Sequence, residues 1–183
     1  MTNSSSRFIA LTGLLTAATG LLLAATSPAT AEPWDQKETR LRVYWHDVLS
    51  GNNATAVTVA EGPLTNTSAT QFGKVIVIDD ALTLEPNLTT SKIIGHAEGI
   101  YVSAGKDTLS LMMAMNFVFI DGPYNGSSIA IFGPNFAERK VREMSVIGGT
   151  GVFRFARGYV EIMTWSNTVD TTVQYDIFVR HDD

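Results

Sequence analysis

The chain has 183 residues, of which 45% are hydrophobic and 17% charged, and it carries a formal net charge of −5 without any cysteine. This composition fits one folded domain and is too apolar for a disordered chain. The missing cysteines exclude disulfides, thiol catalysis, iron–sulfur clusters and zinc sites built on thiolates. The acidic balance argues against sequence-independent binding to nucleic acid, which needs clustered Lys and Arg.

The first 31 residues have the three-part pattern of a secretory signal peptide. Met1–Arg7 is polar with one positive charge, Phe8–Ala25 has no charge, and Ala29-Thr30-Ala31 has small residues at its first and third positions. We therefore expect cleavage after Ala31, which leaves residues 32–183 as one secreted domain. The alternative is an uncleaved membrane anchor, because the apolar stretch is nearly long enough to span a bilayer. Pro28 interrupts a helix just before the cleavage site and favours the signal peptide.

Four Asn-x-Ser/Thr sequons follow this leader, at Asn53, Asn66, Asn87 and Asn125. In a secreted protein each sequon that carries a glycan lies on an exposed loop, so we expect a glycoprotein. Without a disulfide, a domain of this size must draw its stability from its core or from partner subunits.

Beyond the leader, the chain consists of short segments rich in Val, Ile, Phe, Tyr and Thr, separated by Gly, Asn, Asp and Pro. Such segments predict strands joined by tight turns, as in an antiparallel sandwich or barrel. We expect breaks at Asp79-Asp80 and at Gly148-Gly149-Thr150-Gly151, and a two-residue hairpin turn at Asn125-Gly126. The predicted strands are Arg40–Leu49, Thr55–Glu61, Phe72–Asp79, Ile93–Ser103, Leu109–Ile120, Ser127–Gly133, Arg142–Ile147, Val152–Thr164 and Thr171–Val179.

Two of the predicted strands are apolar on both faces. Val75-Ile76-Val77-Ile78 and most of Leu109–Ile120 lack the alternation of apolar and polar residues. One face of a monomeric antiparallel sheet is normally wet. The pattern therefore predicts a barrel whose outer surface is covered by other copies of the chain.

The strand Leu41–Leu49 carries the first candidate for chemistry. With a period of two, Asp47 points the same way as Leu41, Val43 and Trp45. A carboxylate among large apolar side chains is poorly solvated, so its pKa rises unless a cation pairs with it. Asp47 is therefore either a general acid or base, or a structural residue that accepts backbone N–H bonds or pairs with a buried arginine.

Two other strands contribute candidates. On Ile93–Ser103, Gly95 and Gly99 share a face with Tyr101, which either leaves space for a ligand before the ring or relieves strain at a bend of the barrel. Arg142 shares a face with apolar side chains, and Asp47 is a candidate partner for its charge.

Three other patterns carry no chemistry. Gly148-Gly149-Thr150-Gly151 resembles a phosphate loop, but strand character follows it where a phosphate loop needs a helix. His46, His96 and His181 are scattered without ligand spacing, so we expect no metal site. A Gly-x-Ser-x-Gly motif is missing as well. Redox chemistry therefore has no evident site, and we expect no cofactor.

Several blocks of the sequence resemble plant dirigent proteins, and in order they cover nearly all of residues 40–181. The most specific block is Arg142–Tyr159, which contains the Gly-Gly-Thr-Gly stretch. The other blocks are Tyr44–Gly51 with its His-Asp pair, Phe72-Gly73, Asp79–Thr83, Gly95–Tyr101 and Tyr175–His181.

This resemblance implies an all-β fold, an eight-stranded antiparallel β-barrel like that of allene oxide cyclases. It implies a homo-oligomer, with a trimer favoured over a dimer, that is secreted to the apoplast and cell wall and has no membrane or nucleic-acid partner. The best-known members direct the stereochemistry of coupling between phenoxy radicals in phenylpropanoid metabolism, and a separate laccase or peroxidase generates the radicals. Other members act on quinone methides, for example by dehydrating an isoflavanol to a pterocarpan.

The resemblance also implies site residues. The catalytic Asp, Tyr and Arg of the family fall on Asp47, Tyr101 and Arg142, while Trp45 and Asn135 are expected to contact the substrate. Pinoresinol-forming members carry an aspartate at the position of Asn135. An asparagine cannot exchange a proton at neutral pH, so this departure favours the dirigent-like subgroup over pinoresinol-type chemistry.

Three functions are then compatible with the chain. In the first, a template for radical coupling, Asp47 hydrogen-bonds or deprotonates a phenol while Tyr101 and Arg142 position and polarise its oxygens. In the second, a lyase or cyclase, Asp47 is the acid that helps a hydroxyl leave. The third is a cell-wall binding protein without turnover.

Overall fold

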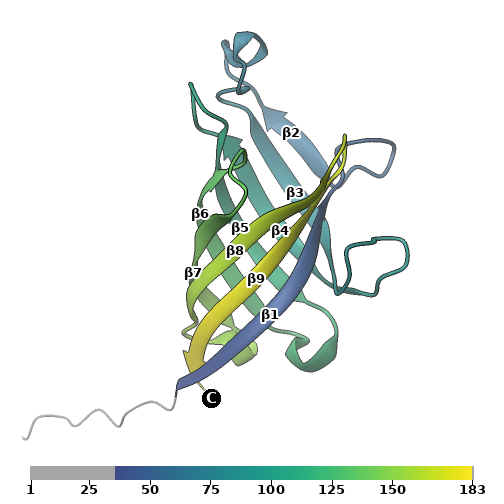
Figure 1. The fold of residues 1–183 in the computed structure, drawn as a ribbon, viewed down its shortest axis with the longest axis vertical. Helices are drawn as coiled ribbons and strands as arrows, with labels where there is room; N and C mark the ends of the chain where they lie inside the picture. The colour runs from purple at the N-terminus through teal and green to yellow at the C-terminus, as the bar shows by residue number, and fades with distance from the viewer. Residues whose placement is uncertain (1–35, 183) are drawn as a thin grey trace, which may run out of the picture. The chain divides into compact units, whose positions relative to one another are not determined.

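The computed structural model describes residues 36–182, which form one antiparallel sheet that closes on itself (Figure 1). The strands run in the order β1-β9-β8-β7-β6-β5-β4-β3, and β1 also pairs with β3. This confirms the predicted eight-stranded barrel, and β2 is an additional strand on the edge of β3. The strands are β1 (Gln36–Asp47), β2 (Ala56–Ala60), β3 (Val75–Thr83), β4 (Ile93–Ser103), β5 (Ser110–Phe119), β6 (Ser128–Phe136), β7 (Arg142–Thr150), β8 (Arg157–Asn167) and β9 (Thr171–Asp182).

Closure of the barrel depends on a short pairing between β1 and β3. It involves only residues 44–46 of β1, whereas β1 pairs with β9 along its whole length. The His46 ring links the three strands, because its Nε2 lies 2.7 Å from Thr83 Oγ1 and its Nδ1 lies 3.2 Å from Thr172 Oγ1. Thr83 donates its hydroxyl proton to the Glu85 carbonyl, so it accepts from His46 Nε2–H. Burial lowers the pKa of His46, which favours the neutral ring.

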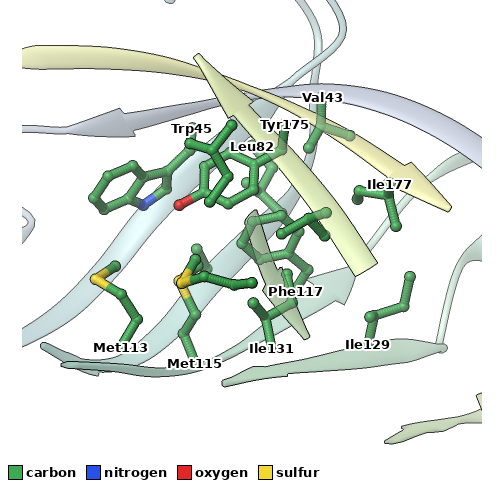
Figure 2. Packing of buried hydrophobic residues seen from close by; sticks show 14 of the residues in the cluster. Val43, Trp45, Leu82, Met113, Met115, Phe117, Ile129, Ile131, Tyr175 and Ile177 are labelled. Carbon is green, nitrogen blue, oxygen red and sulfur yellow. The ribbon is translucent and has the colours of Figure 1, made fainter. Parts of the chain in front are cut away.

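An aromatic cluster fills one end of the interior. The Phe153 ring lies 5.0 Å from that of Tyr124, 5.7 Å from that of Phe119 and 5.3 Å from that of His181, measured between centroids. Next to this cluster the core continues with the side chains shown in Figure 2. There the Tyr175 ring packs edge-on against the Phe117 ring, with 5.1 Å between the ring centroids. Apolar packing thus occupies the end of the barrel where β1 begins and β9 ends.

The predicted Val152–Thr164 strand is wrong at its start. Gly148, Gly149 and Thr150 continue β7 instead of forming a turn, and the chain then makes a 3-10 turn, η3 (Gly151–Phe153). Strand β8 begins only at Arg157. The apolar residues at 152 and 153 gave this region strand character, but Phe153 is buried because it caps the aromatic cluster.

Two predicted turns also differ from the structure. Asp79-Asp80 lies inside β3, where the pairing with β4 runs on through both residues. The connection from β5 to β6 is longer than a two-residue hairpin, because a 3-10 turn, η2 (Gly122–Tyr124), precedes Asn125-Gly126. A third 3-10 turn, η1 (Thr65–Thr67), lies between β2 and β3.

The predicted leader, residues 1–31, lies outside the described residues. Within residues 36–182, no helix has the length and apolar character needed to cross a membrane. The four sequon asparagines, Asn53, Asn66, Asn87 and Asn125, are all exposed and lie between strands. Their positions are compatible with glycosylation, which stays a prediction.

Gly158 allows β8 to approach β9 closely, and its replacement tests how tightly the barrel wall is packed. A Cβ at Gly158 would lie 1.9 Å from the Phe178 carbonyl oxygen, whereas a Cβ at Gly148 meets nothing closer than 3.9 Å. We expect Gly158→Ala to lower the free energy of unfolding by about 2 kcal/mol or more, because backbone must move. Gly148→Ala should change it by less than about 1 kcal/mol. Urea unfolding measures both, and equal losses would contradict this account of the wall.

Candidate active site

Polar side chains gather inside the barrel at the end opposite the aromatic cluster. Asp47 ends β1, Tyr101 lies near the end of β4, and Arg142 begins β7. Because neighbouring strands are antiparallel, the end of one and the start of the next meet at the same end of the barrel. In Figure 1 this is the end where the hairpin between β8 and β9 lies.

Asp47 and Tyr101 contact each other directly. The Tyr101 hydroxyl donates to Asp47 Oδ2 at 3.1 Å, and only 7% of Asp47 and 5% of Tyr101 is exposed. Burial raises the pKa of Asp47 to about 6, although the hydrogen bond from Tyr101 acts in the opposite direction. The pKa of Tyr101 is raised by burial and by the nearby Asp47 carboxylate, so its hydroxyl remains a donor. The structure therefore brings together two of the three predicted catalytic residues.

Asp80 is a second buried carboxyl group, which the sequence analysis assigned to a turn. It is completely buried and accepts a hydrogen bond from the Thr55 hydroxyl. Burial, with a smaller effect of the Asp47 carboxylate in the same direction, raises the pKa of Asp80 to about 8. The Trp45 indole lies near enough to lower the pKa of Asp80 slightly, but its N–H does not reach hydrogen-bond geometry.

The two carboxyl groups form an acid–base pair near neutral pH. With pKa values of about 6 for Asp47 and about 8 for Asp80, at pH 7 Asp47 is mostly ionised and Asp80 mostly protonated. Their charges interact, so the titration belongs to the pair. Two acids whose environments separate their pKa values can act as proton donor and proton acceptor in one site.

Arg142 does not pair with Asp47 as the sequence suggested. The buried guanidinium donates to Thr164 Oγ1 at 2.9 Å, and the structure shows no ion pair for it among residues 36–182. Burial lowers the pKa of Arg142, which remains far above neutrality. Asn135 lies at the end of β6 and is 5% exposed. It and Trp45 are the two predicted substrate contacts at this end of the barrel. A cation and an amide therefore face the same interior as the two carboxyl groups.

Six buried polar atoms in the described part of the chain have no hydrogen-bond partner within the protein. Such atoms are rare in folded proteins, and each one is a candidate contact for a ligand. All six belong to side chains that point into the barrel, and Figure 2 shows two of them, the Trp45 nitrogen and the Tyr175 oxygen, near each other. The atoms are Trp45 Nε1, Asp47 Oδ1, Asp80 Oδ2, Asn135 Oδ1, Arg142 Nε and the Tyr175 hydroxyl oxygen.

The glycines of β4 serve strand packing. A Cβ at Gly95 would lie 2.5 Å from the Val118 carbonyl oxygen, and a Cβ at Gly99 would lie 2.3 Å from that of Ala114. Both glycines are thus needed for close approach of neighbouring strands, which was neither of the two alternatives for this row, and backbone fills the space that the sequence suggested for a ligand at these two positions. Among residues 36–182, no cluster of His, Cys, Asp or Glu is arranged to hold a metal ion.

The sequence contained a signal for Asp80 that was not used. Asp80 shares the inward face of β3 with Ile76 and Ile78, at the same period of two that identified Asp47. The adjacent pair Asp79-Asp80 is typical of a turn, and that local preference concealed the alternation. Tyr175 was missed for a different reason, since a buried tyrosine in an apolar strand is usually part of the core.

Comparisons with known proteins agree with this fold. The sequence model of the family described as "Dirigent-like protein" matches residues 38–180. The chain is 42% identical over 175 residues to "Dirigent protein 21" of Arabidopsis thaliana, with 92% of each chain covered. It is 40% identical over 188 residues to "Pterocarpan synthase 1" of Glycyrrhiza echinata, covering 99% of this chain and all of the relative.

A solved structure of a pterocarpan synthase dirigent protein matches with a TM-score of 0.76 and 42% identity, over 82% of this chain and 88% of that one. The barrel, its interior site and these relatives define the class. The chain belongs to the dirigent protein family.

The raised pKa of Asp80 predicts a loss of stability with rising pH. Its pKa is about 8 in the folded chain and 3.8 for an exposed aspartate, so between these values the folded state holds a proton that the unfolded state has released. Stability must then fall as pH rises through this range. The wild-type chain should lose free energy of unfolding between pH 6.5 and 8.5. We expect Asp80→Asn to reduce this loss by at least about 1 kcal/mol, which corresponds to a pKa shift of less than one unit.

Urea unfolding at the two pH values measures this difference. Asp79→Asn is the control for loss of an adjacent charge, because the Asp79 side chain is 69% exposed and contacts His96 at 2.9 Å; it should change the pH dependence less than Asp80→Asn does, since its effect on the pKa of Asp80 is small. The same pH dependence in wild type and Asp80→Asn would contradict the assignment of a protonated Asp80.

Proposed function

We propose that this dirigent protein binds phenolic radicals, or the quinone methides that they form, inside the barrel and imposes stereochemistry on their coupling. A separate laccase or peroxidase would generate the radicals. The observation that carries the proposal is the pair of buried carboxyl groups, Asp47 and Asp80, in an interior whose polar atoms lack partners. This arrangement suits a ligand with several oxygens that must be oriented and must exchange protons.

In the coupling step, two radicals each contribute one electron to a new carbon–carbon bond, so the protein neither oxidises nor reduces its substrate. Orientation decides which faces of the radicals meet, and a difference of a few kcal/mol between competing approaches gives strong selectivity. Arg142 Nε–H has no partner among residues 36–182 and can donate to a phenolic oxygen, while the Tyr101 hydroxyl oxygen can accept from a phenol as its own proton points to Asp47. These groups support the first function derived from the sequence.

Ring closure after coupling requires two proton transfers. A hydroxyl group attacks a quinone methide carbon and gives up its proton, while the carbonyl oxygen of the quinone methide gains one and becomes a phenol. Asp47, ionised at pH 7, can accept the first proton, and Asp80, protonated at pH 7, can supply the second. The pair then returns to its starting state when one proton passes between the carboxyl groups.

A lyase that acts through a quinone methide is the second candidate, favoured by the raised pKa of Asp80. Asp80 can protonate a leaving hydroxyl while Asp47 removes a phenolic proton, so that a C–O bond breaks and water leaves. An internal phenol then adds to the quinone methide, giving its proton to Asp80 while Asp47 protonates the carbonyl oxygen. In this scheme the acid is Asp80 rather than Asp47, to which the sequence assigned the role. The relative named pterocarpan synthase supports keeping this candidate.

The coupling function is tested with purified protein, a laccase and a panel of monolignols, followed by chiral chromatography. We expect an enantiomeric excess with the wild-type chain that falls to near zero with Asp47→Asn or Asp80→Asn. Consumption of the phenols should stay unchanged, because the laccase oxidises them. Asp79→Asn should keep the selectivity, since its side chain is exposed outside the barrel. Racemic product from the wild-type chain across the panel would reject this function.

The same variants distinguish the lyase. An isoflavanol is supplied without any oxidase, and its dehydration is followed by chromatography. Turnover by the wild-type chain, reduced at least about 100-fold in Asp80→Asn, would establish the second candidate, because loss of a general acid typically costs this much.

We also propose that the chain assembles into a homo-oligomer, with a trimer favoured, through a row of apolar residues on the outside of the barrel. Strand register aligns Val57, Val77, Ile100, Ala114 and Phe132 across five neighbouring strands. Val57 is 55% exposed and Phe132 46% exposed in the single chain. A contiguous apolar row of this kind supports burial against other copies.

Phe132→Glu should weaken this assembly. A charge placed in the outer apolar row cannot be buried without a partner, so the variant should sediment as a monomer at micromolar concentration. Val169→Glu is the control, because Val169 is 68% exposed but lies in the hairpin between β8 and β9. A wild-type chain that sediments as a monomer would contradict the proposal.

Secretion to the apoplast or cell wall completes the proposal. It is supported by the three-part leader in residues 1–31 and by the four exposed sequons. Phenol-oxidising partners in the same compartment would then supply radicals to the barrel.

A further inference from the structure

A groove on the outside of the barrel is not used by the proposed chemistry. It has a volume of about 490 Å³, within the usual size of ligand sites, and it crosses β1, β9 and β8. Its outward side chains lie near the start of β1 and the end of β9, away from Asp47 and Arg142. They are Glu38, Arg40, Arg157, Tyr159, Phe178 and Arg180.

Two aromatic rings form the floor of this groove. Tyr159 and Phe178 are cross-strand neighbours, and their rings stack at 4.8 Å with an interplanar angle of 16°. Arg40 is the neighbour of Phe178 on the next strand, and its guanidinium lies 5.5 Å from the centre of the Phe178 ring. Phe178 therefore lies between Tyr159 and Arg40, and Tyr159, which is 39% exposed, is the part of this aromatic platform that a ligand ring can contact.

Three arginines from successive strands surround the platform. Arg157 donates to the carbonyls of Ile147 and Ala156, which holds its guanidinium in place while leaving other N–H groups free. Among the described residues, neither Arg40 nor Arg157 forms an ion pair with a carboxylate, whereas Arg180 pairs with Glu38 at 2.8 Å. The groove therefore has excess positive charge on a protein whose net charge is −5.

The charges on the two sides of the aromatic platform differ in sign. On one side of the aromatic row, Arg157 lies directly opposite Arg180 on the neighbouring strand. On the other side, Glu143 and Glu161 lie opposite each other in the pairing of β7 with β8. Anionic groups of a ligand would be attracted to the first side and repelled from the second. Neighbouring strands are about 4.8 Å apart, so the arginines form a line of charges rather than converging on one point.

We infer that this groove binds an acidic polysaccharide, a chain of uronate sugars. The apolar face of a sugar ring would pack on Tyr159, and carboxylates of the same or successive sugars would meet Arg40 and Arg157. Several arginines in a line can each meet one carboxylate of a polymer that carries carboxylates at regular intervals. A small acid with one carboxylate could contact only one of these arginines. The groove would attach the protein to a polymer from outside while the interior stays accessible to phenolic substrates.

The probe is a de-esterified hexamer of galacturonate, titrated into the secreted protein and followed by calorimetry at low salt. We expect saturable binding that weakens as salt is added. Arg157→Gln and Arg40→Gln should each weaken it at least about fivefold, and Tyr159→Ser should weaken it without any change of charge. Glu38→Gln should strengthen binding about threefold, because it releases Arg180 from its ion pair.

Arg139→Gln is the matched control. Arg139 also lies over an aromatic ring, 4.2 Å from the centre of Phe136, but outside the groove. It should leave binding unchanged, and thermal unfolding should confirm that all variants are folded. Four results would overturn the inference. They are no binding of the galacturonate hexamer, binding of a neutral hexamer with the same affinity, displacement of the bound hexamer by benzoate as effective as by free hexamer, or a loss of affinity in Arg139→Gln as large as in Arg157→Gln. Stereoselective coupling in the interior is measured separately, so its failure and the failure of this site are distinguishable.

Discussion

The short pairing of β1 with β3 is the constraint on which the rest of the structure depends. It turns an open sheet into a barrel, and the His46 ring secures it by bridging a threonine on each neighbouring strand. The residues on either side of His46 alternate to the other face, so the same closure directs Trp45 and Asp47 into the interior. Without it Asp47 would not be buried beside Tyr101, and its pKa would not be raised.

The interior of the barrel has an apolar end and a polar end. The end around Phe153 is packed with aromatic rings, whereas the end around Asp47 and Asp80 keeps buried polar atoms without partners. Burying such atoms costs free energy that a chain without disulfides must recover elsewhere, here from the apolar packing of the same barrel. The glycines that bring strands close together belong to this compensation, because they let the wall close around the core.

Local patterning predicted an antiparallel sandwich or barrel and the inward direction of Asp47, and the resemblance to dirigent proteins specified the eight-stranded barrel. The bounds of Ile93–Ser103 were predicted to the residue, whereas β3, β8 and β9 extend beyond their predicted ends. Local patterning did not yield the partner of Arg142, because that depends on register: Thr164 is brought to Arg142 by the pairing of β7 with β8. Asp80 was missed because turn preference and strand alternation conflict at Asp79-Asp80, and the ladder with β4 decides between them. The start of β8 was misplaced because Phe153 is apolar for a reason other than strand formation, namely to cap the core.

The two ends of the described chain lie side by side. Gln36 pairs with Asp182, the last described residue, whereas the active-site end of the same strand pair is marked by Asp47 opposite Thr171 (Figure 1). Twelve residues of strand separate the two ends, about 40 Å at the usual rise. Ends that are adjacent and remote from Asp47 suit circular permutation, fusion and surface immobilisation. The fold can therefore be attached to a carrier by its ends while the end that holds Asp47 stays free of the attachment.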